Sequence, residues 1–414
     1  MSRSLPILAA LLGLAIAQTP GTTPEVHPKL QTWECTKAGG CVAKNSQLVL
    51  DSMTHPIYQK DNPTLNCGDG DGPPNATVCP DEATCAQNCI MEGISDYTKY
   101  GVSTDGSSLL LKQLLDGRTV SPRVYLLDEA GEKYDMLKLT GGELSFDVDM
   151  SKLPCGMNGA LYLSEMEADG GKSELNTGGA AYGTGYCDAQ CYGKPFVNGV
   201  ANLKAQGLCC NEMDIWEANL AATSIAPHTC NQTSLYKCSG AECEFDGVCD
   251  KWGCSYNPYA LGNKDYYGPG LKVDTSRPFT VTTQFPANEN GTLYAIRRLY
   301  VQDGKVIQNA ALMVDDSVAF DELNDAYCSR PGGGTFMKLG GIPGMGEALS
   351  RGMVLIFSVW WDVGGFMNWL DSGNTGPCNA TEGNPEVIKQ IQPDPSVVFS
   401  QVKWGEIDST YSTK

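Results

Sequence analysis

Three carboxylates lie within six residues in the segment CCNEMDIWEAN, residues 209–219. Glu212, Asp214 and Glu217 are interspersed with apolar residues, and the segment begins with two adjacent cysteines. Paired carboxylates can cleave a glycosidic bond with retention of configuration when one attacks the sugar and the other protonates the leaving oxygen. That chemistry requires two carboxyl groups about 5–5.5 Å apart. The segment is therefore a candidate catalytic site, provided that the fold brings its acids to one face.

A β-strand is the element that could position these acids. Residues two apart on a strand share a face, so Glu212 and Asp214 point the same way, whereas Glu217 faces away on a regular strand. A β-bulge between Asp214 and Glu217 would return Glu217 to the shared face. The Cα atoms of Glu212 and Glu217 are then about four strand steps, or ~13 Å, apart. Side chains that each reach ~3.5–4 Å and lean inward bring the carboxyl groups to about 5–6 Å.

An exposed acidic strand face is the alternative interpretation, because E-x-D-x-x-E is a weak pattern by itself. In that case Met213, Ile215 and Trp216 face the core. The chain also has seven Trp and 18 Tyr, and a Trp ring can stack on the apolar C–H face of a sugar. We expect most of these aromatic residues in the core and a few along a binding cleft.

The N-terminus is typical of a secretory signal peptide. Residues 1–17 carry a basic residue at Arg3, an apolar run over 5–16 and a small residue at Ala17. The run is too short to span a membrane. We expect cleavage after Ala17 and secretion of a chain that begins at Gln18.

The cysteines agree with export. All 18 lie after the predicted signal peptide, and an even number in a secreted chain indicates a disulfide framework. Cys187 and Cys191 could instead suggest a metal site, but the chain has three histidines and no paired CxxC clusters. We expect neither a metal nor another cofactor. Four glycosylation sequons are compatible with the same compartment, at Asn75, Asn231, Asn290 and Asn379.

The charge balance argues against nucleic acid as a partner. Removing Arg3 from 29 basic residues leaves 28 against 48 acidic residues, a net charge of −20. Phosphate binding requires clustered Lys and Arg. A neutral polymer or small molecule is the expected ligand, although acidity also simply keeps a secreted protein soluble.

Short strands separated by turns account for most of the chain, and one domain over residues 18–414 is the economical interpretation. Strict alternation in GELSFDVDMS, from Gly142, predicts a half-buried strand. Helical periodicity is scarce, and PDEATCAQNC, from Pro80, is the best candidate. The pattern predicts an all-β sandwich or jelly roll. Further strands are predicted from Phe279 (FTVTTQF), Gly291 (GTLYAIRRLYV), Met353 (MVLIFSVWW) and Val397 (VVFSQVKWGEI).

Motifs along the whole chain resemble glycoside hydrolase family 7, the secreted fungal cellulases. They begin with HPKLQTWECTKAGGC near residue 27 and CPDEATC at 79–85, and end with GMVLIFSVWWD at 352–362 and NWLDSG at 368–373. Between these lie LPCGMNGALYLSEMEADGG at 153–171, YGTGYCDAQC at 182–191, CCNEMDIWEAN, PHTC at 227–230 and YNPYALGN at 256–263. The order and extent of these motifs are far more specific than the acidic segment alone.

The resemblance implies a concanavalin-like β-jelly roll of two large curved antiparallel sheets, with long disulfide-stapled loops and a cellulose-binding cleft. It implies retaining hydrolysis of β-1,4-glucosidic bonds, with Glu212 as nucleophile and Glu217 as general acid/base. Asp214 would orient the nucleophile, and His228 would lie near the leaving-group side. A structural histidine beside a disulfide is the alternative for His228.

The same resemblance implies substrate-binding residues and a disulfide pattern. Each binding residue has an alternative in a loop or the core, and Trp360 lies in a strongly apolar strand. Nine disulfides with no free thiol are implied, including Cys187 and Cys191 paired with Cys209 and Cys210. The implied substrate-binding residues are Trp360, Trp369, Tyr162, Asn158, Gln190 and Asp188.

Short loops favour an open cleft and internal cleavage over the roofed tunnel of a cellobiohydrolase. Only 17 residues separate Cys191 from Cys209, and the segments 243–249 and 370–383 are also brief. Ala260 stands where tunnel enzymes tend to have an arginine, and SMTH at 52–55 replaces tryptophans that relatives often have. No C-terminal cellulose-binding module is expected.

The sequence therefore predicts an endo-β-1,4-glucanase that acts as a monomer on cellulose and related β-glucans, without a membrane partner. A cellobiohydrolase of the same family is the first alternative. A non-catalytic sugar-binding jelly roll is the second, because lectins share this architecture.

Overall fold

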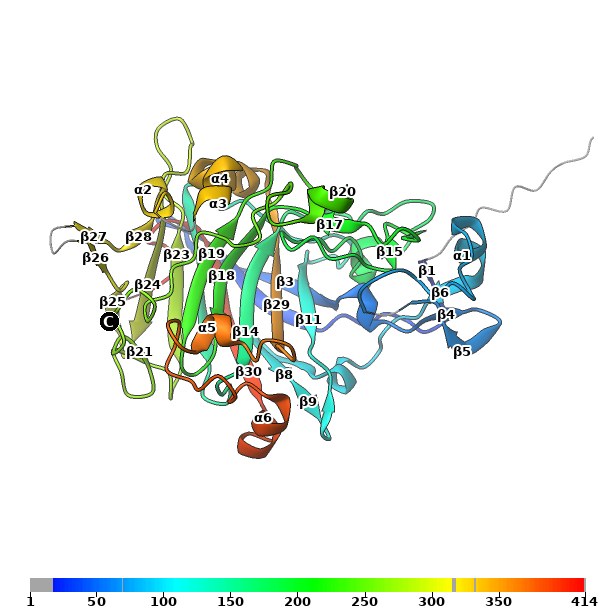
Figure 1. The fold of residues 1–414 in the computed structure, drawn as a ribbon, viewed down its shortest axis with the longest axis horizontal. Coiled ribbons are helices and arrows are strands. Elements are labelled where there is room, and N and C mark those ends of the chain that lie inside the picture. The colour runs from blue at the N-terminus through cyan, green and yellow to red at the C-terminus, as the bar shows by residue number, and fades with distance from the viewer. Residues whose placement is uncertain (1–17, 69, 315–317, 331–332, 413–414) are drawn as a thin grey trace, which may run out of the picture.

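A 16-stranded hydrogen-bonded sheet organises the chain in the computed structural model (Figure 1). Neighbouring strands along its main path are antiparallel, except for the parallel pair β2–β30. The path runs through β19 (Thr223–His228), β18 (Glu212–Ala218), β14 (Met157–Ser164), β29 (Met353–Trp361), β11 (Arg123–Leu127), β3 (Gly40–Leu50), β2 (Lys29–Thr36), β30 (Ser396–Glu406), β13 (Gly142–Asp149), β23 (Phe279–Gln284), β24 (Ile296–Gln302) and β25 (Lys305–Gln308). Four short strands pair beside this path: β7 (Val102–Asp105), β8 (Ser108–Lys112), β12 (Met136–Leu137) and β28 (Glu322–Leu323).

The structure describes residues 18–68, 70–314, 318–330 and 333–412, so the predicted signal peptide at 1–17 lies outside it. Within those ranges, no helix has both the length and the apolar character needed to cross a membrane.

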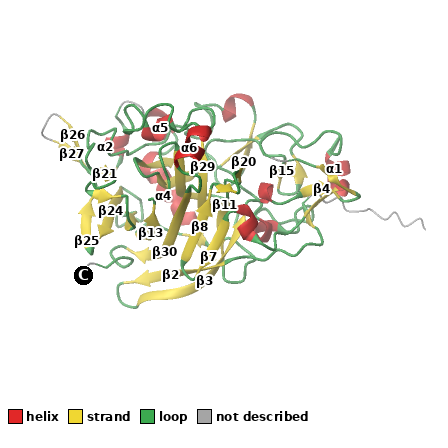
Figure 2. Cartoon of the chain, turned by 90° about the horizontal axis from the view of Figure 1, so that it is seen from below, coloured by secondary structure: helices red, strands yellow, loops and turns green. Residues whose placement is uncertain are grey.

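The sheet curls so that strands far apart along the path face each other. The Trp216 ring of β18 lies 6.1 Å from Phe146 of β13 and 5.9 Å from Phe279 of β23, in edge-to-face contacts. Phe357 of β29 similarly lies 5.5 Å from Phe399 of β30. These contacts close one apolar core between the two layers. Figure 2 shows the strands of the sheet from below. The architecture is the predicted two-layer β-jelly roll, with the layers joined by continuous strand pairing.

The predicted strands are present, with two differences. The strand expected from Gly291 is β24, which begins only at Ile296. The strand from Gly142 is β13, whose polar face is partly exposed at Asp147 and Asp149, as predicted, but buried at Glu143 and Ser145. This end of the polar face is covered because Glu143 accepts hydrogen bonds from the backbone N–H groups of residues 408–410 in the C-terminal segment.

Helices are few, and the one predicted from Pro80 is α1 (Glu82–Asn88), capped by Asp81. The longest helix, α4 (Gly341–Arg351), was not predicted, because its segment contains three glycines and a proline. It forms because Ile342, Met345 and Leu349 lie on one face and are fully buried in the core. The other helices are α2 (Asp325–Cys328), α3 (Gly334–Lys338), α5 (Asn368–Asp371) and α6 (Pro385–Ile391).

Small sheets and nine disulfides stabilise the loops around the main sheet. A four-stranded sheet packs beside α1 at one end of the molecule (Figure 1), formed by β1 (Thr19–Pro20), β6 (Cys89–Met91), β4 (Ile57–Gln59) and β5 (Asn62–Asn66). Two-stranded ribbons are formed by β9 (Leu114–Leu115) with β10 (Arg118–Thr119), β15 (Phe196–Val197) with β16 (Val200–Ala201), β17 (Gly207–Cys209) with β20 (Tyr236–Cys238), β21 (Tyr267–Gly268) with β22 (Val273–Asp274), and β26 (Leu312–Val314) with β27 (Val318–Phe320).

All 18 cysteines are paired, which confirms the expected disulfide framework. The pairs are Cys35–Cys41, Cys67–Cys89, Cys79–Cys85, Cys155–Cys378, Cys187–Cys210, Cys191–Cys209, Cys230–Cys249, Cys238–Cys243 and Cys254–Cys328.

Candidate active site

The strand β18 has a bulge at the predicted position. Its pairing with β19 shifts register between Asp214 and Glu217. Across β14, Glu217 lies opposite Ala160 and Glu212 lies opposite Ser164. Ala160 and Ser164 are four residues apart, an even number, so they and their partners share a face. The bulge therefore places Glu212 and Glu217 on the same surface of the sheet, about 13 Å apart at Cα.

The other face of β18 carries apolar residues. Met213 and Trp216 lie opposite Leu163 and Leu161 of β14, and all four are fully buried. Met213, Ile215 and Trp216 are in the core, as the alternative interpretation also had them, but Glu212 and Asp214 are buried and do not form the exposed acidic face of that alternative. Trp216 cannot contact a sugar, and β18 is anchored by packing on one face while its other face carries the acids.

Glu212 is held by the loop that the paired cysteines constrain. It is 7% exposed, and its Oε2 accepts a 3.0 Å hydrogen bond from the backbone N–H of Ala189. The disulfides Cys187–Cys210 and Cys191–Cys209 fasten the two ends of this loop to the base of β18. Burial, followed by the charges of Asp214 and Asp188, raises the pKa of Glu212 well above its usual range.

Glu217 is half-buried and fixed by Asn158 of β14. The Asn158 Nδ2 donates a 2.9 Å hydrogen bond to Oε1 of Glu217. Its Oδ1 accepts one of 3.1 Å from the backbone N–H of Ala218, which fixes the amide orientation. Burial first, and then the charge of Asp214, raise the pKa of Glu217 to about 8. A carboxyl group with that pKa keeps its proton in mildly acidic water, as a general acid must.

Asp214 contacts His228 from the adjacent strand β19. The Nε2 of His228 lies 3.0 Å from Oδ2 of Asp214. The Nδ1 of the same ring lies 2.9 Å from the backbone carbonyl oxygen of Asp250. Burial, followed by the charge of Asp188, raises the pKa of Asp214 to about 8. His228 is therefore part of the acidic cluster and is not only a residue beside the Cys230–Cys249 disulfide.

The other predicted polar residues border the same cluster. Asp188 accepts a 2.9 Å hydrogen bond from the Tyr186 hydroxyl and a 3.0 Å bond from the N–H of Cys191. The hydroxyl oxygens of Tyr162 and Tyr186 are 3.0 Å apart. Gln190 instead donates to the carbonyl oxygen of Lys251 at 3.0 Å and so ties together two loops beside the acids.

Trp360 and Trp369 form a stacked aromatic pair. Their ring centroids are 6.4 Å apart, at an interplanar angle of 26°. Trp369 is 45% exposed, and Trp360 is half-buried at the end of β29, opposite Asn158 of β14. The core alternative for Trp360 is therefore wrong. This strand end places the pair beside the residue that binds Glu217.

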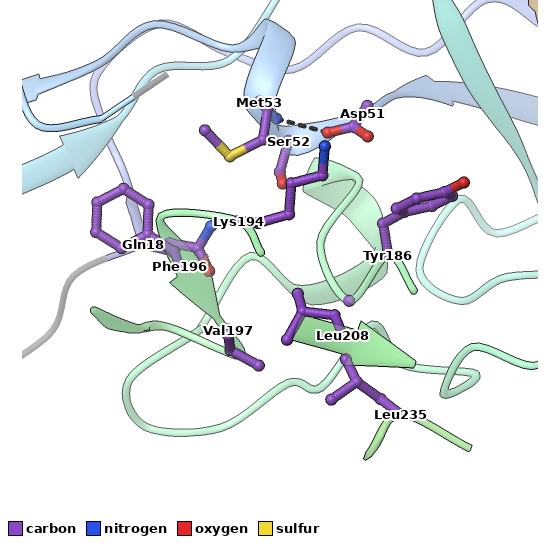
Figure 3. A pocket seen from close by; sticks show the side chains of 11 residues that line it. Gln18, Asp51, Ser52, Met53, Tyr186, Lys194, Phe196, Val197, Leu208 and Leu235 are labelled. Carbon is purple, nitrogen blue, oxygen red and sulfur yellow. Dashed lines mark hydrogen bonds between the residues drawn. The ribbon is translucent and has the colours of Figure 1, made fainter. Parts of the chain in front are cut away.

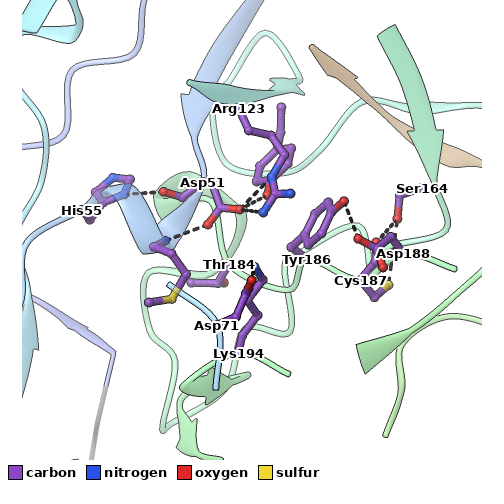
Figure 4. A network of polar contacts seen from close by, with 12 residues as sticks. Asp51, His55, Asp71, Arg123, Ser164, Thr184, Tyr186, Cys187, Asp188 and Lys194 are labelled. Atoms are coloured by element: carbon purple, nitrogen blue, oxygen red, sulfur yellow. Dashed lines mark hydrogen bonds and ion pairs between the residues drawn. The ribbon is translucent and has the colours of Figure 1, made fainter. Parts of the chain in front are cut away.

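The structure also reveals an ionic network that sequence analysis missed (Figure 4). Asp51 accepts a 2.9 Å hydrogen bond from Nε of Arg123 and one of 2.6 Å from the Tyr125 hydroxyl. The Arg123 guanidinium lies 3.5 Å from the centroid of the Tyr186 ring, and the Tyr186 hydroxyl donates to Asp188. The network thus reaches the residue preceding Ala189, whose N–H binds Glu212. In the sequence, Asp51 directly follows the apolar end of β3, and Arg123 begins the apolar strand β11. A charged residue at each of these strand ends is the sequence feature that could have indicated the network.

The charge of Asp51 is stabilised by two cations. Burial alone would raise its pKa, but Arg123 and Lys194 lower it to about 2. Lys194 reaches toward Asp51 across a small pocket that Tyr186 and Leu208 also border (Figure 3). SMTH at 52–55 begins here as a 3₁₀ turn, Ser52–Thr54, which Asp51 caps through the N–H of Met53.

Among the described residues, the groups spaced to bind a metal consist of disulfide-bonded cysteines, with Glu382 in one of them. Their sulfur atoms are already used in covalent bonds. At β18, the buried Glu212 accepts a hydrogen bond from the Ala189 N–H, which stabilises its anion. Glu217 has a raised pKa and lies on the same face of the strand.

Comparison with known proteins agrees with this geometry. The family model described as glycosyl hydrolase family 7 matches residues 20–411. A probable endo-beta-1,4-glucanase of Aspergillus terreus is 58% identical, with 99% of this chain and 98% of that protein aligned. Endoglucanase EG-1 of Humicola insolens is 54% identical over 98% of this chain and 94% of its own length.

Solved structures give the same result. The native Humicola insolens endocellulase EGI superposes with a TM-score of 0.93 at 55% identity, covering 95% of this chain and 100% of its own. A family 7 cellobiohydrolase of Daphnia pulex superposes with a TM-score of 0.88 at 34% identity, with coverage of 95% and 100%. The chain belongs to glycosyl hydrolase family 7.

Proposed function

We propose that this protein is a retaining endo-β-1,4-glucanase that cleaves internal bonds of cellulose and related β-glucans. The observation that carries the proposal is the bulge in β18, which puts Glu212 and Glu217 on one face of the sheet. Retaining hydrolysis requires a nucleophile and a proton donor on one surface, with the sugar between them.

In the first step, an oxygen of the Glu212 carboxylate attacks the anomeric carbon while the bond to the glycosidic oxygen breaks. The proton of Glu217 goes to that oxygen, and the shortened chain leaves as an alcohol. In the second step, Glu217 takes a proton from water as the water oxygen attacks the same carbon. Glu212 is released as a carboxylate, and the configuration of the sugar is retained.

Glu212 must be ionised to attack, although its surroundings raise its pKa. A proton held on the Asp214–His228 pair removes one of the two negative charges that oppose ionisation of Glu212. The Ala189 N–H then stabilises the Glu212 anion directly. Asp214 and His228 thus act as positioning residues that set the protonation of the nucleophile.

The exposed Trp369 ring, stacked on Trp360, supports binding of a neutral sugar ring. Endo cleavage is supported by the short segment between Cys191 and Cys209 and by the higher identity to endoglucanases than to cellobiohydrolases. One structural relative is titled endoglucanase I complexed with cellobiose. Secretion, cleavage after Ala17 and action as a single-domain monomer belong to the same proposal.

The endo mode is tested by viscosity and reducing sugar measured together on carboxymethylcellulose. Viscosity should fall well before reducing ends accumulate, whereas parallel changes indicate exo cleavage. The nucleophile is tested with a 2-fluoro aryl cellobioside, which should leave a covalent adduct on the peptide containing Glu212. Glu212→Gln and Glu217→Gln proteins should fold, and the Glu217→Gln protein should lose about 10²- to 10⁴-fold in kcat on β-glucan. Full activity in either variant overturns the assignment.

A further inference from the structure

A buried arginine contacts the bulge of β18 from the facing layer of the sheet. Arg298 lies on β24 and is 5% exposed. Its Nη2 donates a hydrogen bond to the carbonyl oxygen of Ile215, and its guanidinium carbon lies 5.5 Å from the centroid of the Trp216 ring. Ile215 and Trp216 are the two residues between Asp214 and Glu217, where the register of β18 shifts. Arg298 therefore contacts both residues of the bulge.

The bulge takes Ile215 out of regular strand pairing. Among the described pairings of β18, Ile215 has no partner on either side, toward β14 or toward β19. The β19 residue between the flanking pairs is Ile225, whose N–H and carbonyl oxygen instead bond to the backbone of Tyr256. Ile215 itself is fully buried. A buried carbonyl oxygen that a bulge removes from the ladder requires another donor, and Arg298 supplies one.

The contacts of Arg298 are hydrogen bonds to uncharged groups. Besides the bond to Ile215, its Nε donates a 3.1 Å hydrogen bond to Oγ1 of Thr283, which is fully buried on β23. A guanidinium buried without a carboxylate costs free energy, so core packing alone would favour an apolar side chain at this position. The guanidinium instead provides a donor directed at the bulge. In the described part of the chain, the arginines that form ion pairs with carboxylates are Arg123, Arg277, Arg297 and Arg351.

The bulge decides where Glu217 lies relative to Glu212. On one side of the bulge, Glu212 is held by the backbone N–H of Ala189. On the other side, Glu217 lies opposite Ser224 of β19. A regular strand would turn Glu217 toward the apolar face. A group that stabilises the bulge therefore sets the position of the proton donor relative to the nucleophile.

We propose that Arg298 is a positioning residue for the reaction. By binding the Ile215 carbonyl oxygen, it fixes the bulge that aligns Glu217 with the glycosidic oxygen. It acts through β18 from the core side of the strand, and Thr283 holds its guanidinium in place. This inference rests on the proposed glucanase function and names the residue that keeps the proton donor of that function in line.

The test is the leaving-group dependence of the Arg298→Met protein, in which the side chain keeps its length but loses its donors. A displaced Glu217 protonates the leaving oxygen less efficiently, so kcat/KM on phenyl β-cellobioside should fall about 10- to 100-fold. Dinitrophenolate leaves without a proton, so kcat/KM on dinitrophenyl β-cellobioside should stay within about twofold. Both rates are measured at a temperature where circular dichroism shows that the variant is folded.

Arg297→Met is the matched control. Arg297 precedes Arg298 on β24, but it is exposed and its Nε lies 2.7 Å from Oε2 of Glu322. Its replacement should leave kcat/KM on both cellobiosides within about twofold. An equal loss on phenyl β-cellobioside in this control would show that the effect does not come from the contact with the bulge.

Two milder variants make the same comparison if Arg298→Met does not fold. Thr283→Val removes the acceptor that orients the guanidinium, and kcat/KM on phenyl β-cellobioside should fall about threefold, with dinitrophenyl β-cellobioside unaffected. Arg298→Lys keeps a donor and should lose less activity than Arg298→Met. Equal losses on both cellobiosides, or no loss on phenyl β-cellobioside, would overturn the positioning role of Arg298.

The proposed function fails separately, if the unsubstituted protein cleaves neither cellobioside. A crystal structure of the Arg298→Met or Thr283→Val protein still tests the inference in that case, because it requires no turnover. The pairing of β18 with β19 should change between Asp214 and Glu217. An unchanged pairing would show that Arg298 does not hold the bulge.

Discussion

The Nε2 of His228 lies 3.0 Å from Oδ2 of Asp214, and its Nδ1 lies 2.9 Å from the Asp250 carbonyl oxygen. A carbonyl oxygen only accepts, so Nδ1 carries a hydrogen. The contact between Nε2 and Asp214 then requires one further proton, held by either residue. The Asp214–His228 pair therefore holds a shared proton within the acidic cluster.

Replacing His228 should shift the pH dependence of activity. A protonated His228 lowers the pKa of both Glu212 and Glu217, so His228→Gln should shift both limbs of kcat/KM to higher pH. We expect kcat at the optimum to fall about 10- to 100-fold. Rates on an aryl cellobioside across pH measure both effects, and an unchanged profile would mean that His228 is structural.

The alkaline limb of the pH–activity profile should depend on the leaving group of the substrate. Glu217 has a pKa of about 8, so activity on β-glucan should fall as pH rises through that value and the proton is lost. A dinitrophenyl cellobioside has a leaving group that needs no proton, and its first step should stay fast above pH 8. Pre-steady-state release of dinitrophenolate measures this step. A fall of equal size on both substrates would show that Glu217 is not the acid.

Glu217→Gln should stabilise the protein at higher pH. The pKa of Glu217 is raised from 4.5 to about 8 on folding, so the unfolded chain loses its proton first as pH rises. The protonated Glu217 of the folded protein therefore contributes stability at low pH, and this contribution is lost progressively between about pH 4.5 and pH 8. The advantage of the Gln variant should grow by up to about 1.4 kcal/mol per pH unit over this range. Denaturant unfolding of both proteins at pH 4, 6 and 8 measures the difference in their free energies of unfolding. A difference that does not change with pH would contradict the raised pKa of Glu217.

Removing the Cys191–Cys209 disulfide should damage catalysis more than folding. This bond closes 18 residues of chain, so its loss should cost about 3 kcal/mol. It also frees the loop whose Ala189 N–H binds Glu212, so kcat should fall at temperatures where the protein stays folded. The Cys191→Ala/Cys209→Ala protein is compared with Cys35→Ala/Cys41→Ala, which opens a hairpin between β2 and β3. Equal kcat in the two variants would show that the Cys191–Cys209 disulfide does not position Glu212.

Local pattern was enough to predict much of the fold. Alternation predicted β13 and unbroken apolar runs predicted β29, because strand burial leaves a short-range signature. The helix α4 was missed because its glycines are poor helix formers, and packing of Ile342, Met345 and Leu349 overrides that preference. The bulge in β18 was predicted only by requiring that Glu217 share a face with Glu212.

The sequence alone determined which groups are present: three acids close together, an even set of cysteines and a family resemblance along the chain. Only the tertiary structure decided which of them meet. Asp51 and Arg123 are 72 residues apart, and His228 meets Asp250 through a loop 22 residues away. Strand pairing and disulfides create these contacts, and no local pattern records them because the partners are distant in sequence. The burial that raises the pKa of Glu217 likewise arises only when β14 and β19 pair with β18 on either side of it.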